Sequence, residues 1–142
     1  MNNVEDKNPK NKVGETPLHY AAWNGHLSVC QFIVNNVKDK NPRNIHGFTP
    51  LQNAALWGHF EAFKLISENV EDKNPQDHHK NTPLHYAARV GHLKFCKYII
   101  SKVEDKNFAI NSKNNFNNTP FQLAERYHHQ QLVDYMKSQI EK

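Results

Sequence analysis

A seven-residue motif occurs four times along this chain of 142 residues. Thr-Pro-Leu-His-Tyr-Ala-Ala stands at residues 16–22 and returns unchanged at residues 82–88. Related copies stand at residues 49–55 and 119–125, so successive copies begin 33, 33 and 37 residues apart. A period of this length is typical of one supersecondary unit stacked on itself. The motif therefore predicts an array of repeats, without a single central core.

Two further segments recur in the same order and at nearly the same spacing. Val-x-Asp-Lys-Asn-Pro begins at residues 4, 37 and 70, and in a fourth copy, from residue 103, phenylalanine replaces the proline. Gly-His, which precedes an apolar run, stands at residues 25–26, 58–59 and 91–92, and becomes His-His at residues 128–129. Three motifs in one fixed order predict a single repeating unit.

Within one unit, the residues predict two helices and a loop. Thr16 is a good N-cap, and Pro17 suits the first helical position, where its missing N–H costs nothing. Gly25 is expected to end this short helix in the left-handed conformation. A second helix is expected from near Leu27 to residues 35–36, because the next segment contains a proline that disfavours helix in the residue before it.

Taken together, these motifs resemble the ankyrin repeat family. Thr-Pro-Leu-His-x-Ala-Ala, Gly-His and an Asp-x-Asn segment, at a period of 33, match that family over almost the whole chain. The resemblance implies an all-α repeat solenoid of stacked helix-turn-helix units, with short inner helices, longer outer helices and β-hairpin loops on one side. The expected divisions of this ankyrin repeat domain, residues 1–142, are a partial repeat at 1–15, repeats at 16–48, 49–81 and 82–118, and a C-terminal capping repeat at 119–142.

The ends of the outer helices depart from the family pattern. The family usually has glycine just after the outer helix, where this chain has Val37, Val70 and Val103. A β-branched residue tolerates positive φ badly. We therefore expect the left-handed residue to move back to Asn36 and Asn69, or the helix to end in another way.

The hairpin loops depart as well. Glycine occupies the hairpin position at Gly14 and Gly47, but Lys80 and Asn117 replace it later. Because lysine accepts the left-handed conformation less readily than asparagine, the third loop is expected to be reshaped. Four extra residues lie between Phe108 and Thr119, and we expect them to enlarge the fourth hairpin.

Composition agrees with a stack of thin apolar layers. Only 37% of the residues are hydrophobic and the mean hydropathy is −0.85. The net charge of +4 arises from cations interleaved with acids, so nucleic acid is possible but not favoured. Cys30 and Cys96 share one repeat position two units apart, on the order of 20 Å, which is too far for a disulfide. We expect reduced thiols and a cytoplasmic protein, and no apolar run long enough to cross a membrane.

The two ends of the array differ. The last outer helix has Gln130, Gln131, Asp134 and Lys137 at positions that suit a polar cap. The first unit has no such cap and begins in the loop motif, so a fragment of a longer array is the expectation, with a natural start as the alternative.

No motif for nucleotide binding or nucleophilic catalysis is present, so we expect neither an enzyme nor a cofactor. His26, His59, His92 and His129 recur roughly 10 Å apart, too far for one metal, and are expected to bond the backbone of the inter-helix turns. His19 and His85 lie at the third helical position, within reach of the capping threonine hydroxyls.

The resemblance implies a non-catalytic scaffold whose concave face binds another protein, in agreement with the variable positions of the repeat. Lys12, Val13, Glu15 and Phe116 are among these positions. The candidate partner-binding residues are Trp23, Asn24, Arg43, Ile45, His46, Phe48, Leu56, Trp57, His78, His79, Asn81, Arg89, Val90, Arg126 and Tyr127. The surface is expected to centre on the second and third units, and to suit a partner with acidic and apolar anchor residues.

Two alternative functions stay open. The basic residues could bind nucleic acid in a groove: Lys10, Lys12, Arg43, Lys80, Arg89 and Arg126. The chain could instead be a structural spacer within a longer array. At the residue level, Trp57 could pack against the next inner helix instead of contacting a partner.

Overall fold

The computed structural model describes residues 8–140. Helices occupy more than half of these residues, as the period predicts. Four helix pairs follow one another: α1 (Pro17–Asn24) with α2 (Leu27–Asn36), α3 (Pro50–Trp57) with α4 (Phe60–Ser67), α5 (Pro83–Val90) with α6 (Leu93–Lys102), and α8 (Pro120–Arg126) with α9 (Gln130–Ile140). A short additional helix, α7 (Lys106–Asn111), lies between the third and fourth pairs.

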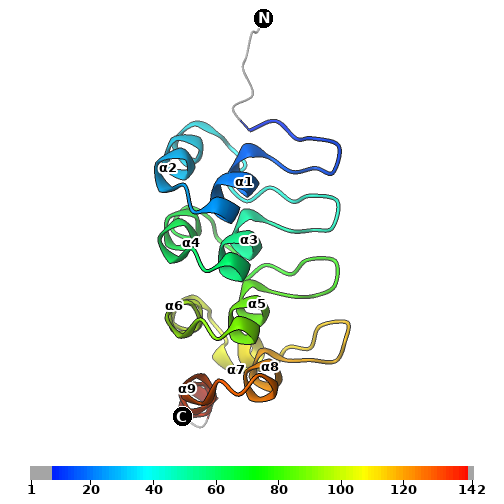
Figure 1. The fold of residues 1–142 in the computed structure, drawn as a ribbon, viewed down its shortest axis with the longest axis vertical. Coiled ribbons are helices and arrows are strands. Elements are labelled where there is room, and N and C mark those ends of the chain that lie inside the picture. Colours follow the sequence, from blue (N-terminus) through cyan, green and yellow to red (C-terminus); the bar gives the residue numbers. More distant parts are fainter. Residues whose placement is uncertain (1–7, 141–142) are drawn as a thin grey trace, which may run out of the picture.

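The pairs form a straight stack with three parallel columns (Figure 1). The inner helices α1, α3, α5 and α8 lie in the middle, the outer helices α2, α4, α6 and α9 lie on one side, and the hairpin loops project on the other. Between residues 8 and 140 no segment is a strand, so the expected β-hairpins are turns closed by isolated hydrogen bonds. The all-helical repeat architecture is otherwise as expected.

Each inner helix begins in the same way. The threonines before the four prolines are N-caps with extended backbone, and each forms a capping box with the third helical residue. The paired alanines that follow in the first three units, and the single Ala124 in the fourth, are buried and let neighbouring inner helices approach closely. Between the outer helices, Phe63 packs edge-on against Phe95 with ring centroids 5.1 Å apart. Each unit thus buries a thin layer against the next, and the layers make one continuous core.

The third hairpin keeps the shape of the others, so the expected reshaping is wrong. Asp77 N donates to Asn81 O at 2.9 Å, as Asn44 N does to Phe48 O. Lys80 adopts φ 62 and Asn117 φ 63, close to the φ 78 of Gly47. Asp77 Oδ1 accepts hydrogen bonds from the amides of His79 and Asn81, at 2.9 Å each, and so holds the lysine in the left-handed turn.

The four extra residues do not enlarge the fourth hairpin, which closes between Asn114 N and Asn118 O at 3.0 Å like its neighbours. They are accommodated by α7, ahead of the hairpin. Asp105 caps this helix by accepting from Phe108 N at 2.9 Å, and Ile110 anchors it in the core. The cause lies in the sequence: Phe108 stands where the earlier copies have proline, and its amide and the preceding residue are free to become helical.

The outer helices end without a left-handed residue. Val37 is extended, with φ −124 and ψ 157, and neither Asn36 nor Asn69 has positive φ. In two of the Val-x-Asp-Lys segments, the lysine takes over the capping role. Lys40 Nζ donates to Val37 O at 2.6 Å, and Lys73 Nζ donates to the carbonyls of Ser67 and Val70 at 2.5 and 2.8 Å. A cation on the last carbonyls also complements the negative end of the helix dipole.

The thiols of Cys30 and Cys96 are free and buried, in agreement with their shared repeat position. Burial raises the pKa of the Cys30 thiol to about 11 and raises that of Cys96 as well. In the part of the chain that the structure describes, no helix is long and apolar enough to span a membrane.

Candidate functional site: the concave groove

The inner helices are tied to the hairpins of the next unit by the side chain at the third helical position. His19 Nε2 lies 2.8 Å from Phe48 O, and His85 Nε2 lies 3.0 Å from Ser112 O and 3.1 Å from Asn118 O. In the second unit, Gln52 Nε2 donates to Pro75 O at 2.7 Å. These bonds fix the angle between the helices and the loops, and so shape the groove.

The bonds also fix the protonation state of the two histidines. Thr16 N donates to His19 Nδ1 at 3.1 Å, and Thr82 N donates to His85 Nδ1 at the same distance. Nδ1 is therefore the unprotonated nitrogen, and Nε2–H donates to the next loop. Burial lowers the pKa of both rings and keeps them neutral. The expected contacts with the capping threonine hydroxyls are confirmed, at 3.0 and 2.9 Å.

The hairpins form the opposite wall. Ile45 N donates to Val13 O, His78 N to His46 O, and Asn115 N to His79 O, at 2.9, 3.0 and 2.9 Å. Each hairpin thus makes a backbone hydrogen bond to the one before it. The wall is continuous along the stack, in agreement with the row of loops in Figure 1.

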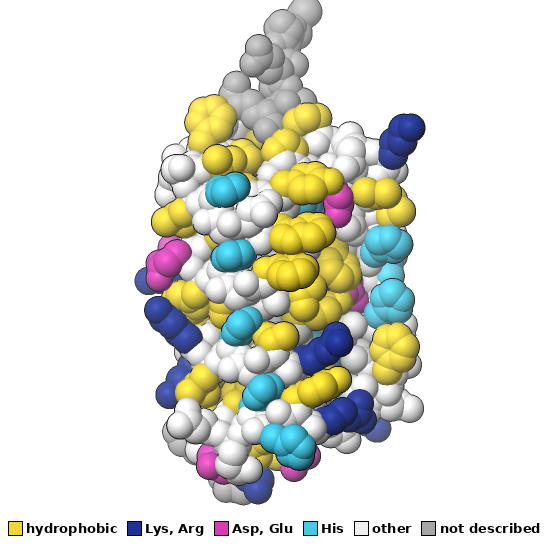
Figure 2. Space-filling view, in the orientation of Figure 1, with side chains coloured by type: hydrophobic (Ala, Val, Ile, Leu, Met, Phe, Trp, Pro, Cys, Tyr) yellow, Lys and Arg dark blue, Asp and Glu magenta, His cyan; other side chains and the backbone are white. Residues whose placement is uncertain are grey.

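The recurring histidines of the Gly-His motif lie against the glycine of the unit before. A Cβ added to Gly25 would stand 2.5 Å from His59 Nδ1, and one on Gly91 would stand 2.5 Å from His129 Nδ1. His129 also bonds to the backbone, with Nε2 3.0 Å from Arg89 O. Figure 2 shows a column of histidine side chains down one face of the stack, and the contacts with the glycines indicate that the Gly-His histidines pack one turn on the next.

Three exposed rings form what we call the aromatic row: Tyr20, Trp23 and Trp57. The rings of Tyr20 and Trp23 stack at a centroid distance of 6.3 Å and an interplanar angle of 8°. Trp23 also stacks on Trp57, at 5.7 Å and 11°. The three residues are 45%, 37% and 52% exposed. Trp57 therefore packs on the preceding unit, is not buried against α5, and keeps half of its surface open to solvent.

Farther along the groove, two arginines and two rings surround a pocket of about 160 Å³, which we call the arginine pocket. Arg89, Arg126, Tyr127 and Phe116 line it together with hairpin asparagines, and all four are exposed. Within residues 8–140 neither guanidinium makes a hydrogen bond or an ion pair. Figure 2 shows hydrophobic side chains in a column along the inner helices, with Lys and Arg side chains beside its lower part.

The structure brings part of the predicted set together. The inner helices expose Trp23, Trp57, Arg89, Val90 and Arg126, and Tyr127 is exposed just after α8. The hairpins expose Ile45, His46, His78 and His79. His79 stacks on Phe116 with centroids 5.9 Å apart. Asn24 lies at the N-terminal end of the stack, where its Nδ2 donates to Tyr20 O at 2.9 Å.

Other predicted residues are used for packing or lie elsewhere. Phe48 is half-buried with its ring 5.5 Å from Tyr86, and Leu56 packs against the core. Asn81 Oδ1 accepts from Asn114 Nδ2 at 2.7 Å. Arg43 donates to Gly47 O at 2.9 Å and to Gln76 O at 2.6 Å, and it faces a different cleft.

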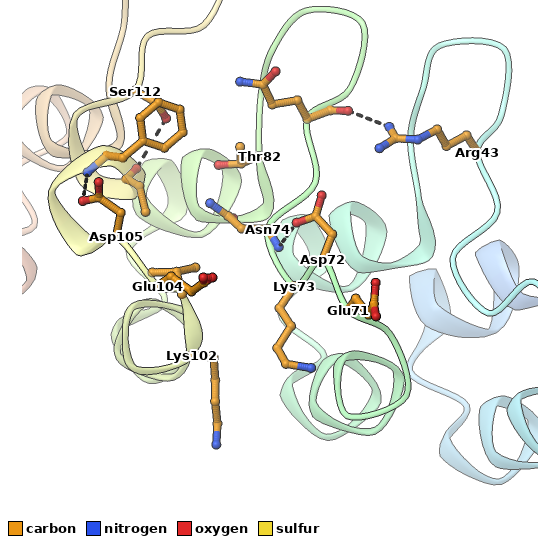
Figure 3. A pocket seen from close by; sticks show the side chains of 14 residues that line it. Arg43, Glu71, Asp72, Lys73, Asn74, Thr82, Lys102, Glu104, Asp105 and Ser112 are labelled. Atoms are coloured by element: carbon orange, nitrogen blue, oxygen red, sulfur yellow. Dashed lines mark hydrogen bonds between the residues drawn. The ribbon is translucent and has the colours of Figure 1, made fainter.

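That cleft, of about 660 Å³, was not predicted from the sequence (Figure 3). It lies between the Val-x-Asp-Lys segments of two units and α7, and its carboxylates are those of Glu71, Asp72, Glu104 and Asp105. Arg43 is directed at the carbonyl of Gln76 in the neighbouring loop (Figure 3). The lost proline at residue 108 and the four-residue insertion were the available signals, because together they allow α7 to form.

Comparison with known proteins agrees with this architecture. A family model described as ankyrin repeats, three copies, matches residues 1–77 and 65–142. No curated protein sequence gives a significant match. Ankyrin repeats are generally protein–protein interaction modules and are typically non-enzymatic. With matches spanning its whole length and four stacked helix pairs, the chain belongs to the ankyrin repeat family.

Proposed function

We propose that this chain is a non-catalytic scaffold that binds a segment of a partner protein in the concave groove between the inner helices and the hairpins. The observation that carries the proposal is the aromatic row. Its three rings are contiguous and exposed although the repeat does not require aromatic residues at these positions. A contiguous exposed apolar patch is typical of an interaction site.

The row is well suited to binding because it is already ordered. Each ring is held by stacking on its neighbour, so little side-chain entropy is lost when a partner covers it. Tryptophan and tyrosine are also among the residue types that contribute most to interfaces. An apolar anchor of the partner would displace water from a surface that needs no rearrangement.

The charge of the groove supports a partner with acidic residues beside its apolar anchors. Arg89 and Arg126 line the groove beyond Trp57, and the chain as a whole carries +4. Complementary charge favours encounter and correct orientation of the two partners. Two of the other basic residues are already engaged, since Lys10 Nζ donates to Arg43 O at 3.3 Å and Arg43 is bonded to loop carbonyls.

The test starts from peptides selected from a random phage-displayed library against the immobilised chain. Affinity is then measured by calorimetry for the wild type and for Trp57→Ala. Trp57→Ala is expected to cost about 2 kcal/mol of binding, close to thirty-fold in affinity, if it is a hot spot.

Phe32→Ala is the matched control, because Phe32 is an exposed aromatic residue, 56% accessible, on outer helix α2. Its affinity should equal that of the wild type. A melting curve recorded for each variant separates binding from stability. Unchanged affinity in Trp57→Ala, with a sharply lower melting temperature, would make Trp57 a stacking residue and refute the proposal.

A further inference from the structure

We infer that the arginine pocket is a carboxylate-binding subsite, and that the partner segment carries an Asp or Glu a fixed distance from the apolar residue that covers Trp57. This inference rests on the proposed function. Units stack at roughly 10 Å, and Arg89 and Arg126 lie one and two units beyond Trp57. An extended peptide spans about 3.3 Å per residue, so the acid should lie about three to six residues from the apolar anchor.

The first argument is that the groove changes character at one repeat position. The residue seven places after the capping threonine is Trp23 in the first unit, Leu56 in the second, Arg89 in the third and Arg126 in the fourth. The position is therefore apolar in the first half of the stack and cationic in the second. Stacking does not impose this change, because Arg89 and Arg126 are exposed.

The second argument is that the two guanidiniums lack a carboxylate in the described part of the chain. The neighbouring acid, Asp77, is buried and already used: its Oδ2 accepts from the Tyr86 hydroxyl at 2.5 Å, and its Oδ1 accepts two amides. Burial and this bond raise the pKa of Tyr86, so its hydroxyl keeps the proton it donates. A guanidinium binds a carboxylate through two parallel N–H donors, which adds geometric specificity to the charge attraction.

The third argument is that the aromatic row disfavours a cationic partner. Cations bind to the faces of aromatic rings. Trp23 lies between the nearly parallel rings of Tyr20 and Trp57, at interplanar angles of 8° and 11°, so its two faces are turned toward these rings and are less open to a cation than its edge is. Ring edges carry the positive part of the quadrupole and are compatible with an acidic segment.

A protein segment also fits the groove better than nucleic acid does. DNA affinity comes largely from cations that neutralise phosphates, and DNA-binding proteins can make on the order of 6–10 such contacts. The arginine pocket supplies two cations, and the surface next to it is apolar. The groove offers cations at the arginine pocket and an apolar surface at the aromatic row. A short acidic peptide with an apolar anchor matches both.

The experiment is a comparison of random-peptide selections on three proteins: the wild type, Arg89→Glu/Arg126→Glu, and Lys94→Glu/Lys97→Glu. The last pair is the control, because both lysines are exposed on outer helix α6 and the change in net charge is the same. The wild type and the control should enrich peptides with Asp or Glu three to six residues from an apolar residue. The arginine variant should keep the apolar residue and exchange the acid for Lys or Arg. A wild-type peptide should lose at least ten-fold in affinity for the arginine variant and none for the control.

Three results would overturn the inference. Peptides that depend on Trp57 but show no acid at this spacing would leave the proposed function standing and remove the subsite. If the peptides selected on Arg89→Glu/Arg126→Glu carry Asp or Glu at the same spacing as those selected on the wild type, acids are recognised outside the arginine pocket. A fluorescein-labelled DNA duplex that binds the wild type, with a salt dependence of several counterions, and fails to bind the arginine variant would assign the arginines to nucleic acid. If instead no selected peptide depends on Trp57, the proposed function itself fails.

Discussion

At the scale of single residues, the third position of each inner helix determines how one unit is joined to the next. A histidine ring and a glutamine amide can make the same two hydrogen bonds there. Each has one atom that accepts from the backbone N–H of the capping threonine and one N–H that donates to a carbonyl of the next loop. His19 and Gln52 show this directly: Nδ1 or Oε1 faces the cap, and Nε2 faces a loop carbonyl of the following unit. The two chemistries differ in one respect, since the ring can be protonated.

This difference predicts an acid-sensitive step in stability. Burial holds the pKa of His19 and His85 below the 6.5 of an exposed histidine, so below about pH 6.5 the unfolded chain binds more protons than the folded chain. The stability that the neutral rings contribute is complete above that pH and is lost as the pH falls through the lowered pKa values. In the variant His19→Gln/His85→Gln, the free energy of unfolding should depend less on pH.

The measurement is urea unfolding at about pH 8 and about pH 5 for the wild type and the variant. Near pH 8 the two should be similar, because Gln52 already makes the same bonds in the second unit. Equal loss of stability on acidification in both proteins would show that these two rings are not the titrating groups.

Sequence reasoning reached half of this arrangement. The contact between the third residue and its own cap follows from helix geometry, and it is confirmed. The second bond joins residues about thirty positions apart, and it depends on how one unit is offset from the next, which no local rule supplies. For the same reason, Lys80 was expected to distort its hairpin, whereas the bonds made by Asp77 hold it at positive φ.

At the scale of elements, one substitution and one insertion change a loop into a helix. A Val-x-Asp-Lys segment follows each of the outer helices α2, α4 and α6. The first two of these segments lead to a buried proline, Pro42 or Pro75, whereas the third leads to Phe108. Phe108 N donates to the capping Asp105, which a proline could not do. α7 is therefore a consequence of losing proline, with the inserted residues supplying its length.

Restoring the proline should remove the helix. Phe108→Pro loses the N–H that bonds to Asp105 and disfavours helix at residue 107, and the cost should be about 1–2 kcal/mol of stability. Phe108→Ala is the control: Phe108 is 66% exposed, so its removal should change stability by no more than about 0.5 kcal/mol. Urea unfolding measures both. A proline variant as stable as the alanine variant would show that α7 does not depend on this cap.

The insertion shows where prediction from this sequence stopped. The spacing of the repeats places the four extra residues between Phe108 and Thr119. They were expected to enlarge the hairpin, because insertions are usually tolerated in loops. The signal for helix was the combination of Asp105, a lost proline and the buried Ile110. The lost proline is visible in the sequence, but its effect on the inserted residues depends on Ile110 reaching the core, so neither α7 nor the cleft beside it was predicted.

At the scale of the whole molecule, the stack presents one open face whose character changes along its length. The aromatic row occupies the first two units and the arginine pocket the last two. The repeat pattern predicted which positions vary, but not which of them meet. Phe48 and Leu56 lie at variable positions and still pack inward, whereas Trp23 and Trp57 join into one surface across two units.

The central claim is that this open face is where a partner binds, and the chain offers a direct way to test it. Both tryptophans of the sequence, Trp23 and Trp57, lie in the aromatic row. The ¹H–¹⁵N spectrum should therefore contain two indole N–H signals, which Trp23→Phe and Trp57→Phe assign. On titration with a peptide selected against the chain, the account predicts that both signals shift or broaden in step with binding. A peptide that binds by calorimetry while both indole signals stay unchanged would contradict it.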